Sequence, residues 1–185
     1  MMHKLDIEIK NGWIEHVRRV ISPNYDDRPD DSKLEIIVIH GISLPPGDFG
    51  GNGIDQLFTN QINEYDHPYY KKISNIKVSS HVLINREGSI TQYVSFLKRA
   101  WHAGESSHLG KGSCNDYSIG IELEGTDDNP YEDKQYLCLA KLIKSLKKNY
   151  ASLNDGDIVG HCDIAPGRKT DPGKSFDWRY LSSLL

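Results

Sequence analysis

The pattern of hydrophobic and polar positions predicts a sheet with helices packed on it. Residues 34–40 are almost continuously apolar and rich in β-branched side chains, which predicts a central strand buried on both faces. Shorter apolar or alternating runs predict four further strands, at residues 78–84, 90–94, 118–123 and 157–160. The Gly-containing residues 85–88 suit a hairpin between two of these strands.

The clearest helical pattern lies in residues 133–150. Its apolar side chains recur at spacings of three and four, and lysines occupy the other side. We therefore expect one face of this helix to dock on the sheet. Shorter helices are expected over residues 54–59 and after Asp177. Surface loops rich in Gly and Ser are expected over residues 41–53 and 104–115.

Strands and helices that are mixed along the chain predict a mixed α/β fold, in which a single central β-sheet has helices packed on it. The chain has 185 residues, enough to bury its own core, and shows no internal repeat or low-complexity linker. We therefore expect one domain over residues 1–185, and we expect it to be a monomer.

Composition and charge narrow the classes of function. Hydrophobic residues make up 37% of the chain and charged residues 26%, which is typical of soluble proteins, so no membrane span and no membrane partner are expected. Residues 1–8 lack the continuous apolar core of a secretory signal, which predicts a cytoplasmic protein. The net charge is −4, and there is no basic run of the kind that neutralises phosphates, so nucleic acid is not an expected partner.

Two histidine-bearing segments are candidates for a metal site. His40 stands at the end of the central strand, just before a long loop, and His161 opens the segment 160–173, which packs His, Asp, Lys and Arg between turn-forming residues. Two histidines and one carboxylate from separate segments are a known ligand set for catalytic zinc. The sequence contains no Cys-x-x-Cys pair of the kind found in closed structural zinc sites.

The third ligand stays open at this level. Asp163 would share a face with His161 if the segment were an extended strand, whereas Asp171 requires the loop to turn back. Cys162 is a further possibility, although an extended segment would aim it at the opposite face. The residues alone do not decide between these three side chains.

Two further charged residues are candidates for catalysis. Alternation places Glu122 on the strand face opposite Ile121 and Leu123, and desolvation there would prepare its carboxylate to act as a general base. Glu124 shares that face and is the local competitor. Lys169 could stabilise negative charge on a reacting oxygen, or it could be an ordinary solvated lysine.

An aromatic residue and a histidine precede the second long loop. Trp101 could stack on a sugar ring and His102 could hydrogen-bond the sugar's substituents. A buried tryptophan beside a structural histidine is equally consistent with these residues.

Taken together, these motifs resemble those of a known family. They occur in order along nearly the whole chain, at residues 28–31, 40–47, 99–104, 114–116, 118–126 and 160–173. The chain resembles the N-acetylmuramoyl-L-alanine amidases of the zinc amidase and peptidoglycan-recognition fold, and within them the cytoplasmic enzymes of cell-wall recycling. The resemblance implies Zn²⁺ bound by His40, His161 and Asp171, with Asp163 in a supporting role. It also implies Glu122 and Lys169 as the catalytic residues.

The resemblance implies a small-molecule substrate, an anhydromuropeptide, cut between the lactyl group of the muramyl sugar and the L-alanine of the stem peptide. We expect substrate contacts from Trp101, His102, Lys77 and Asn115. Three positions depart from the family pattern: relatives often carry Asn where this chain has Gly41, and Arg where it has Lys77 and Ser113. The alternatives are a non-catalytic peptidoglycan-binding module and a lytic amidase that acts on intact cell wall.

Overall fold

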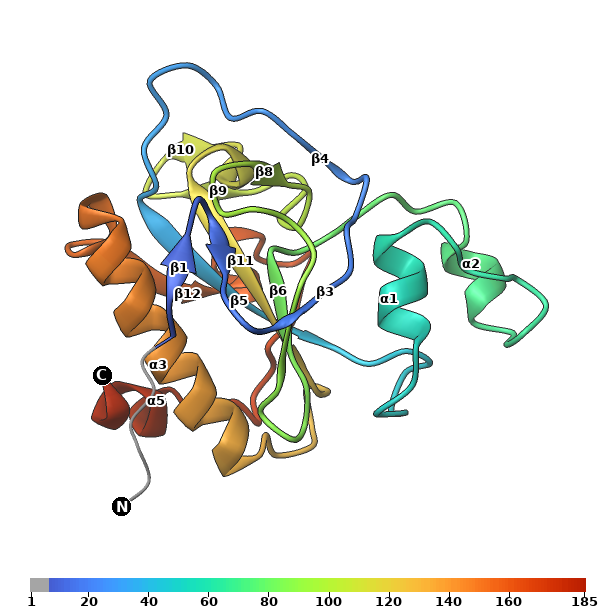
Figure 1. Cartoon of the computed structure of the whole chain (residues 1–185). Coiled ribbons are helices and arrows are strands. Elements are labelled where there is room, and N and C mark those ends of the chain that lie inside the picture. The colour runs from blue at the N-terminus through green and yellow to red at the C-terminus, as the bar shows by residue number, and fades with distance from the viewer. Residues whose placement is uncertain (1–6) are drawn as a thin grey trace.

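The computed structural model describes residues 7–185 (Figure 1). The prediction of a cytoplasmic protein rests on residues 1–8, and of these residues 1–6 lie outside the described part of the chain. Within residues 7–185, no helix combines the length and the apolar character needed to cross a membrane.

Within residues 7–185, the regular structure comprises twelve strands and five α-helices. The strands are β1 (Ile9–Lys10), β2 (Trp13–Ile14), β3 (Arg18–Arg19), β4 (Tyr25–Asp26), β5 (Ile36–Ile42), β6 (Val82–Ile84), β7 (Ile90–Gln92), β8 (Arg99–Ala100), β9 (Ser107–His108), β10 (Lys111–Gly112), β11 (Ser118–Glu124) and β12 (Asp157–Gly160). The helices are α1 (Gly53–Phe58), α2 (Tyr70–Ile73), α3 (Asp133–Asn149), α4 (His161–Ile164) and α5 (Trp178–Leu184), with 3₁₀ turns η1 (Cys114–Asp116) and η2 (Ala151–Leu153).

A six-stranded sheet forms the centre of the molecule, in the order β12-β5-β11-β6-β7-β3. The first four strands of this order run parallel to one another, β7 is antiparallel to β6, and β3 is parallel to β7. The predicted mixed α/β fold with a central sheet is therefore confirmed. Because the neighbouring strands β12, β5 and β11 are parallel, their carboxyl ends meet at one edge of the sheet, which is where open α/β sheets bind ligands.

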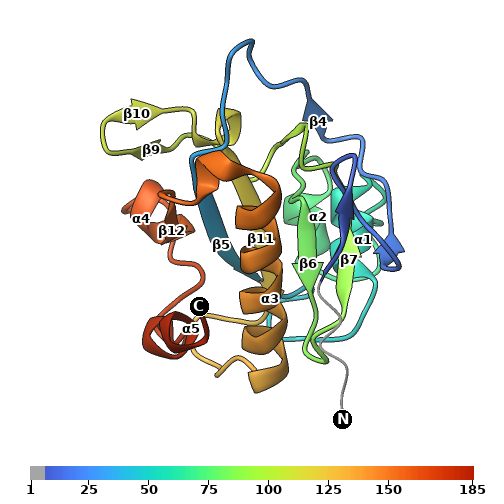
Figure 2. The same cartoon turned by 60° about the vertical axis from the view of Figure 1, so that its left-hand side comes forward.

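Side chains of the two longest strands alternate between two apolar layers. Ile37 and Ile39 of β5 join the main core with α3 and α5, whereas Ile36 and Val38 pack on the other face with Ile164 of α4. Figure 2 shows α3 lying across β5 and β11 on the first face. On the other face, α1 and α2 form a separate apolar cluster with β6 and the segment after β7. Both faces of the sheet are therefore covered, as continuous apolar strands require.

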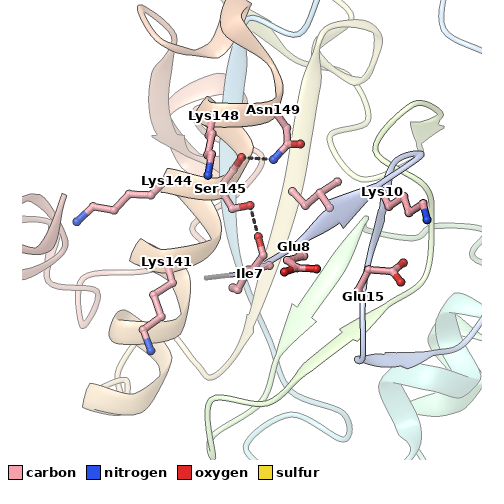
Figure 3. A pocket seen from close by; sticks show the side chains of 10 residues that line it. Ile7, Glu8, Lys10, Glu15, Lys141, Lys144, Ser145, Lys148 and Asn149 are labelled. Carbon is pink, nitrogen blue, oxygen red and sulfur yellow. Dashed lines mark hydrogen bonds between the residues drawn. The ribbon is translucent and has the colours of Figure 1, made fainter. Parts of the chain in front are cut away.

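Helix α3 is amphipathic, as its apolar spacing predicts. Its apolar side packs in the main core, and its first turn is capped where Gln135 Oε1 accepts the backbone N–H of Glu132 (3.0 Å). The lysines Lys141, Lys144 and Lys148 are exposed on the other side. They line a cavity of about 690 Å³ between α3 and the β1–β2 hairpin (Figure 3).

Three local predictions need correction. The strand expected over residues 78–84 covers only β6, because the backbone before it bonds to irregular partners: Ser79 N–H donates to Trp101 O (3.0 Å). The segment after β12, for which an extended strand and a returning loop were both open, begins with a helical turn, α4. The loop expected over residues 104–115 contains the β9–β10 hairpin and most of η1.

Candidate active site

Two histidines meet at the carboxyl ends of adjacent parallel strands. His40 lies near the end of β5, and His161 directly follows β12, whose last residue Gly160 is in register with Ile39. Their Nδ1 atoms are 2.9 Å apart, and both side chains are buried. Strand pairing thus places two imidazoles, 121 residues apart in sequence, against each other.

The loop after α4 turns back and adds a carboxylate to this pair. Cys162 N–H donates to the carbonyl oxygen of Asp171 (2.9 Å), which fixes the return of the loop. Asp171 Oδ2 then lies 3.2 Å from His40 Nδ1 and 3.0 Å from His161 Nδ1. Asp163 faces elsewhere, because its Oδ2 accepts the backbone N–H of Gly160 (2.7 Å). Of the three candidates for the third ligand, the backbone brings Asp171 to the histidines.

The chemistry of these three groups fits a divalent cation. His161 Nε2 lies 3.1 Å from the carbonyl oxygen of Ala103, which can only accept, so Nε2 carries the proton and Nδ1 presents a lone pair. Burial lowers the pKa of His40 to about 4, which keeps its imidazole neutral near pH 7. Burial alone would raise the pKa of Asp171, but the neighbouring imidazoles outweigh burial and hold the pKa below its ordinary value.

Three possible ligand atoms, one from each residue, all lie within 4.8 Å of one another. Two imidazoles and one carboxylate thus lie close enough together to bind one cation. Two histidines and one carboxylate are a known ligand set for catalytic zinc. The residues that the sequence singled out as ligands therefore fit the metal that the resemblance implies.

Glu122 lies beside His40 in the sheet. The two residues are in register on the parallel strands β11 and β5, so their side chains leave the same face of the sheet. Glu122 is 8% exposed, and its Oε2 has no hydrogen-bond partner in residues 7–185. Burial, together with the negative charge of Asp171, raises the pKa of Glu122 well above its usual range. Two neighbouring carboxylates with pKa values shifted in opposite directions are typical of acid–base chemistry.

Glu124 shares the strand face with Glu122 but differs in its partners. Its Oε1 accepts the backbone N–H of Gly50 (2.5 Å), and its Oε2 accepts the backbone N–H of Arg86 (3.1 Å). Both oxygens are thus engaged in holding two loops to the sheet. The structure separates the two glutamates that alternation left equivalent, since only Glu122 has a buried oxygen without a partner.

A cavity of about 600 Å³ opens above these groups. One wall is polar and includes His40, Glu122 and Asp171, together with the exposed Lys169. The opposite wall is mostly apolar and comes from the loop after β5, from α1 and α2, and from the segment before β6: Leu44, Pro46, Leu57, Phe58, Tyr69, Ile73, Ile76 and Val78. A wall of ionisable groups on one side and an apolar surface on the other suit a substrate that has both polar and apolar parts.

Gly41, which departs from the family pattern, has a packing role here. A Cβ at this position would lie 2.2 Å from the hydroxyl oxygen of Tyr131. That hydroxyl donates to the carbonyl oxygen of Pro172 (2.9 Å), next to Asp171. The absence of a side chain at Gly41 therefore leaves room for a tyrosine that holds the loop of the third candidate ligand.

The four residues expected to contact substrate occupy different places. His102 is part of the cavity lining, whereas Trp101, Lys77 and Asn115 are not among its lining residues. Lys77 is exposed and lies between two lining residues, Ile76 and Val78. Both ring nitrogens of His102 face protein atoms: Nδ1 is 2.9 Å from His40 Nε2, and Nε2 is 3.0 Å from Ser118 Oγ.

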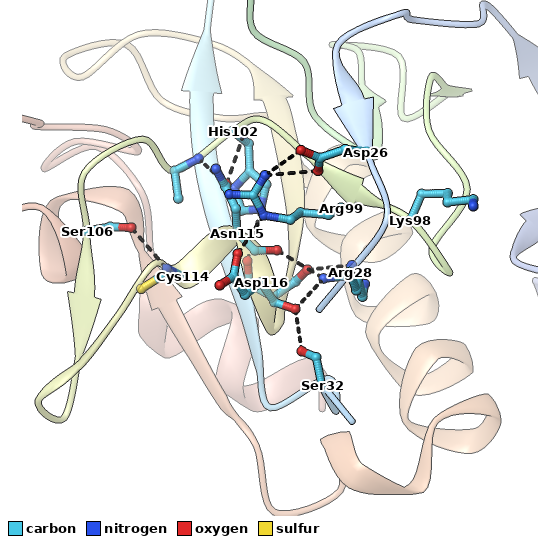
Figure 4. A network of polar contacts seen from close by, with 12 residues as sticks. Asp26, Arg28, Ser32, Lys98, Arg99, His102, Ser106, Cys114, Asn115 and Asp116 are labelled. Carbon is cyan, nitrogen blue, oxygen red and sulfur yellow. Dashed lines mark hydrogen bonds and ion pairs between the residues drawn. The ribbon is translucent and has the colours of Figure 1, made fainter. Parts of the chain in front are cut away.

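Two arginines near the site had no role assigned from the sequence, although both lie in segments that carry the family resemblance. Arg28 is half-buried and donates to the carbonyl oxygens of Asn115 and Asp116 (both 3.0 Å) and of Ser118 (2.9 Å) (Figure 4). Arg168 donates to the carbonyl oxygen of Ala103 (2.5 Å). Their partners are backbone carbonyl groups, which every residue has, so the pattern of side chains does not reveal these contacts.

Comparison with known proteins agrees with this geometry. A model of the family described as N-acetylmuramoyl-L-alanine amidase matches residues 30–174. The 1,6-anhydro-N-acetylmuramyl-L-alanine amidase AmpD of Escherichia coli K12 is 54% identical over 177 residues, which cover 96% of this chain and 96% of that protein.

Two solved structures extend the comparison. A crystal structure of an AmpD derivative superposes with a TM-score of 0.94 at 52% identity and covers 97% of this chain and 99% of its own. The amidase AmiD from E. coli, in complex with the substrate anhydro-N-acetylmuramic acid-L-Ala-D-γ-Glu-L-Lys, superposes with a TM-score of 0.59 at 27% identity. That comparison covers 97% of this chain and 65% of the AmiD chain.

Proposed function

Because the chain belongs to the N-acetylmuramoyl-L-alanine amidase family and is an amidase, we propose that it is a zinc-dependent hydrolase of anhydromuropeptides in peptidoglycan recycling. The bond that it cleaves joins the lactyl group of 1,6-anhydro-N-acetylmuramic acid to the L-alanine of the stem peptide. The name of the E. coli relative and the substrate in the AmiD complex support this choice of substrate class.

One observation carries the proposal. Glu122, with a buried carboxylate oxygen that lacks a partner, lies in register with His40, at the point where His40, His161 and Asp171 converge. A desolvated base beside a metal-ligating set is the arrangement that hydrolysis of an amide by water requires.

The residues divide the chemistry between them. His40, His161 and Asp171 would hold a zinc ion, which would supply a Lewis acid for the amide carbonyl and for the attacking water. Glu122 takes a proton from that water and passes it to the leaving amine, while the water oxygen bonds to the carbonyl carbon and the C–N bond breaks. Lys169 stabilises the negative charge that develops on the carbonyl oxygen.

The two walls of the cavity support a general placement of the substrate. The scissile amide lies at the polar wall, and the rest of the molecule extends along the apolar wall. We keep Lys77 as a contact for a carboxylate of the stem peptide, because its neighbours Ile76 and Val78 line the cavity. Trp101 stays a prediction. The proposed enzyme is one domain over residues 1–185 and acts as a monomer in the cytoplasm, with no nucleic-acid or membrane partner.

Mass spectrometry of the products formed in H₂¹⁸O tests which bond is cleaved, which class of substrate is accepted and whether the reaction needs a metal. We expect an anhydromuropeptide to yield the anhydro sugar with one ¹⁸O atom in its lactyl carboxylate and an unlabelled free peptide. A chelator should stop the reaction, and added Zn²⁺ should restore it.

Three outcomes would contradict the proposal. Label in the peptide fragment would mean that another bond is cut, and full activity in the chelator would exclude metal dependence. Equal release of peptide from intact peptidoglycan would favour a lytic amidase instead. An Asp163→Asn variant is the matched control, because Asp163 lies near the ligands but faces Gly160.

A further inference from the structure

Two consecutive residues, His102 and Ala103, each contact one of the two candidate histidine ligands. The contact is at the outer ring nitrogen, Nε2, which faces away from the proposed metal. The Nδ1 of His102 lies 2.9 Å from His40 Nε2, and the carbonyl oxygen of Ala103 lies 3.1 Å from His161 Nε2. Both contacts are buried. The orientation of the two imidazoles thus depends on one short piece of backbone, residues 102–103, that carries no ligand itself.

These contacts set the tautomers as well as the ring angles. Ala103 O accepts from His161 Nε2, which leaves the His161 Nδ1 lone pair directed at the site. When His40 presents its own Nδ1 lone pair, its Nε2 donates to His102 Nδ1, and His102 Nε2 in turn donates to Ser118 Oγ (3.0 Å). Each residue of this series therefore donates to the next, from His40 through His102 to Ser118 at the start of β11. Partners of this kind on the outer nitrogen fix the tautomer of metal-binding histidines.

A single side chain holds residues 102–103 in place. Asn115 Oδ1 accepts the backbone N–H of His102 (3.1 Å) and the backbone N–H of Ala103 (2.8 Å), as Figure 4 shows for His102 and Asn115. Asn115 is buried in η1, and its backbone carbonyl oxygen accepts from the half-buried Arg28. Arg28 thus holds the backbone of Asn115, while the side-chain amide oxygen accepts two backbone N–H groups.

Packing leaves residues 102–103 little freedom to move. A Cβ at Gly120 of β11 would lie 2.5 Å from Cγ of His102, so the imidazole lies directly on the strand. On the other side, the Arg168 guanidinium donates to the same Ala103 carbonyl oxygen that His161 uses. Residues 102–103 are therefore held by β11 on one side and by Arg168 on the other.

We propose that Asn115 is a positioning residue for the zinc site, which acts by fixing His102 and Ala103 against the outer nitrogens of His40 and His161. This inference rests on the proposed zinc-dependent function and gives Asn115 and His102 a role other than substrate contact. The amide oxygen is the essential atom, because it is the group that accepts both backbone N–H groups.

The test compares Asn115→Ala with Asn115→Asp, which keeps an oxygen at the same place. Zinc affinity is measured without substrate, by competition with a chromogenic chelator, and kcat and KM are measured separately. Loss of such outer partners costs about 10- to 100-fold in metal affinity. We expect a loss of this size in Asn115→Ala, substantial recovery in Asn115→Asp, and a KM for anhydromuropeptide close to wild type once zinc is saturating.

A second pair of variants keeps the test decisive if Asn115→Ala fails to fold. The amide oxygen of His102→Asn can stand where the Nδ1 of His102 stands and accept from His40, whereas His102→Leu has no acceptor. We expect His102→Asn to bind zinc more tightly than His102→Leu. The control is Asn149→Ala, on the exposed side of α3, which should bind zinc like the wild type.

Each remaining outcome has a definite meaning. Wild-type zinc affinity in Asn115→Ala, with a raised KM, would overturn the inference and make Asn115 a substrate contact. Equal zinc affinity in His102→Asn and His102→Leu would remove the role of His102. If the wild type itself binds no zinc, the proposed function fails before this inference is tested.

Discussion

Two cavities of similar volume differ in how far the charged and polar groups that line them are exposed to solvent. The cavity between α3 and the β1–β2 hairpin measures about 690 Å³, and the cavity above the sheet edge measures about 600 Å³. The first is lined by exposed lysines, whose charges are solvated (Figure 3). The second has His40, His161 and Glu122 at its base, and these are 1%, 3% and 8% exposed. Removal of polar groups from water, and not volume, distinguishes the candidate active site.

The largest expected effect comes from removing the Asp171 carboxylate from the cavity above the sheet edge. Without Asp171 the two histidines form an incomplete ligand set, so Asp171→Ala should lose stoichiometric zinc and fall below detectable hydrolysis. Zinc per protein is measured by elemental analysis after gel filtration. Asp163→Asn should keep full zinc. An Asp171→Ala protein with full zinc, beside an Asp163→Ala protein without it, would reassign the third ligand.

Glu122→Gln should leave zinc bound and still reduce kcat by about 10²- to 10⁴-fold, the usual contribution of a general base. The matched variant is Glu124→Gln, whose carboxylate holds the backbone of Gly50 and Arg86. That variant should lose stability, measured by thermal unfolding, with a much smaller change in kcat. The assignment of the base would be wrong if the two variants exchanged these effects.

Lys169→Met should reduce kcat by about 10²- to 10³-fold, because one stabiliser of the developing oxyanion is lost. The expected change lies in kcat, since the charge appears in the transition state. Lys174→Met is the control, because Lys174 is an exposed lysine paired with Asp128. A drop of the same size in both variants would attribute the effect to surface charge and not to the polar wall of the cavity.

Stability should depend on pH through a histidine beneath the buried cavity. Burial, and then the charge of Arg28, lower the pKa of His81 to about 3, against about 6.5 in an unfolded chain. The native state therefore binds fewer protons, so this contribution is complete above pH 6.5 and is lost as pH falls towards 3.

Between pH 7 and pH 5 the loss from His81 is about 2 kcal/mol, because the full slope of about 1.36 kcal/mol per pH unit applies only below the unfolded pKa of about 6.5. In His81→Asn, whose amide oxygen can still accept from Gly120 N–H, denaturant unfolding at saturating zinc should show a correspondingly flatter dependence on pH. An unchanged slope would mean that His81 does not stay neutral in the fold.

The smallest effect should come from the cavity lined by lysines. Replacing Lys141, Lys144 and Lys148 together with serine changes solvated charges only, so kcat/KM should stay within about twofold of the wild type. Steady-state kinetics with anhydromuropeptide measures it. A tenfold loss would mean that this cavity takes part in substrate binding and that burial alone does not mark the functional region.

The sequence predicted those parts of the fold whose signal is local. The apolar β-branched run became β5, and the spacing of apolar residues in 133–150 became α3. The two-residue strands were missed, since strands so short carry no alternation and form only because the tertiary structure pairs them. The turn α4 was missed because it spans only four residues within a segment whose turn-forming residues predict a loop.

In the candidate site, too, some features were predicted from the sequence and others are visible only in the structure. Histidines at strand ends and a glutamate within an apolar strand were visible as patterns, and the structure brings them together. The choice between Asp163 and Asp171 depends on one backbone hydrogen bond that reverses the loop, and periodicity carries no information about it. The support given by Asn115 is equally hidden, because its partners are backbone N–H groups.

Register in the sheet has a consequence for how such proteins can diversify. Adjacent parallel strands lie about 4.8 Å apart, so the separation of the Glu122 and His40 backbones is set by interstrand hydrogen bonding and not by any loop. Insertions or deletions in the loop after Ile42, or in the segment before β6, would reshape the rim of the cavity while that separation stays constant. Exchange of these loops between homologues is therefore a route to new substrate preferences that leaves the spacing of the proposed base and the proposed metal ligand intact.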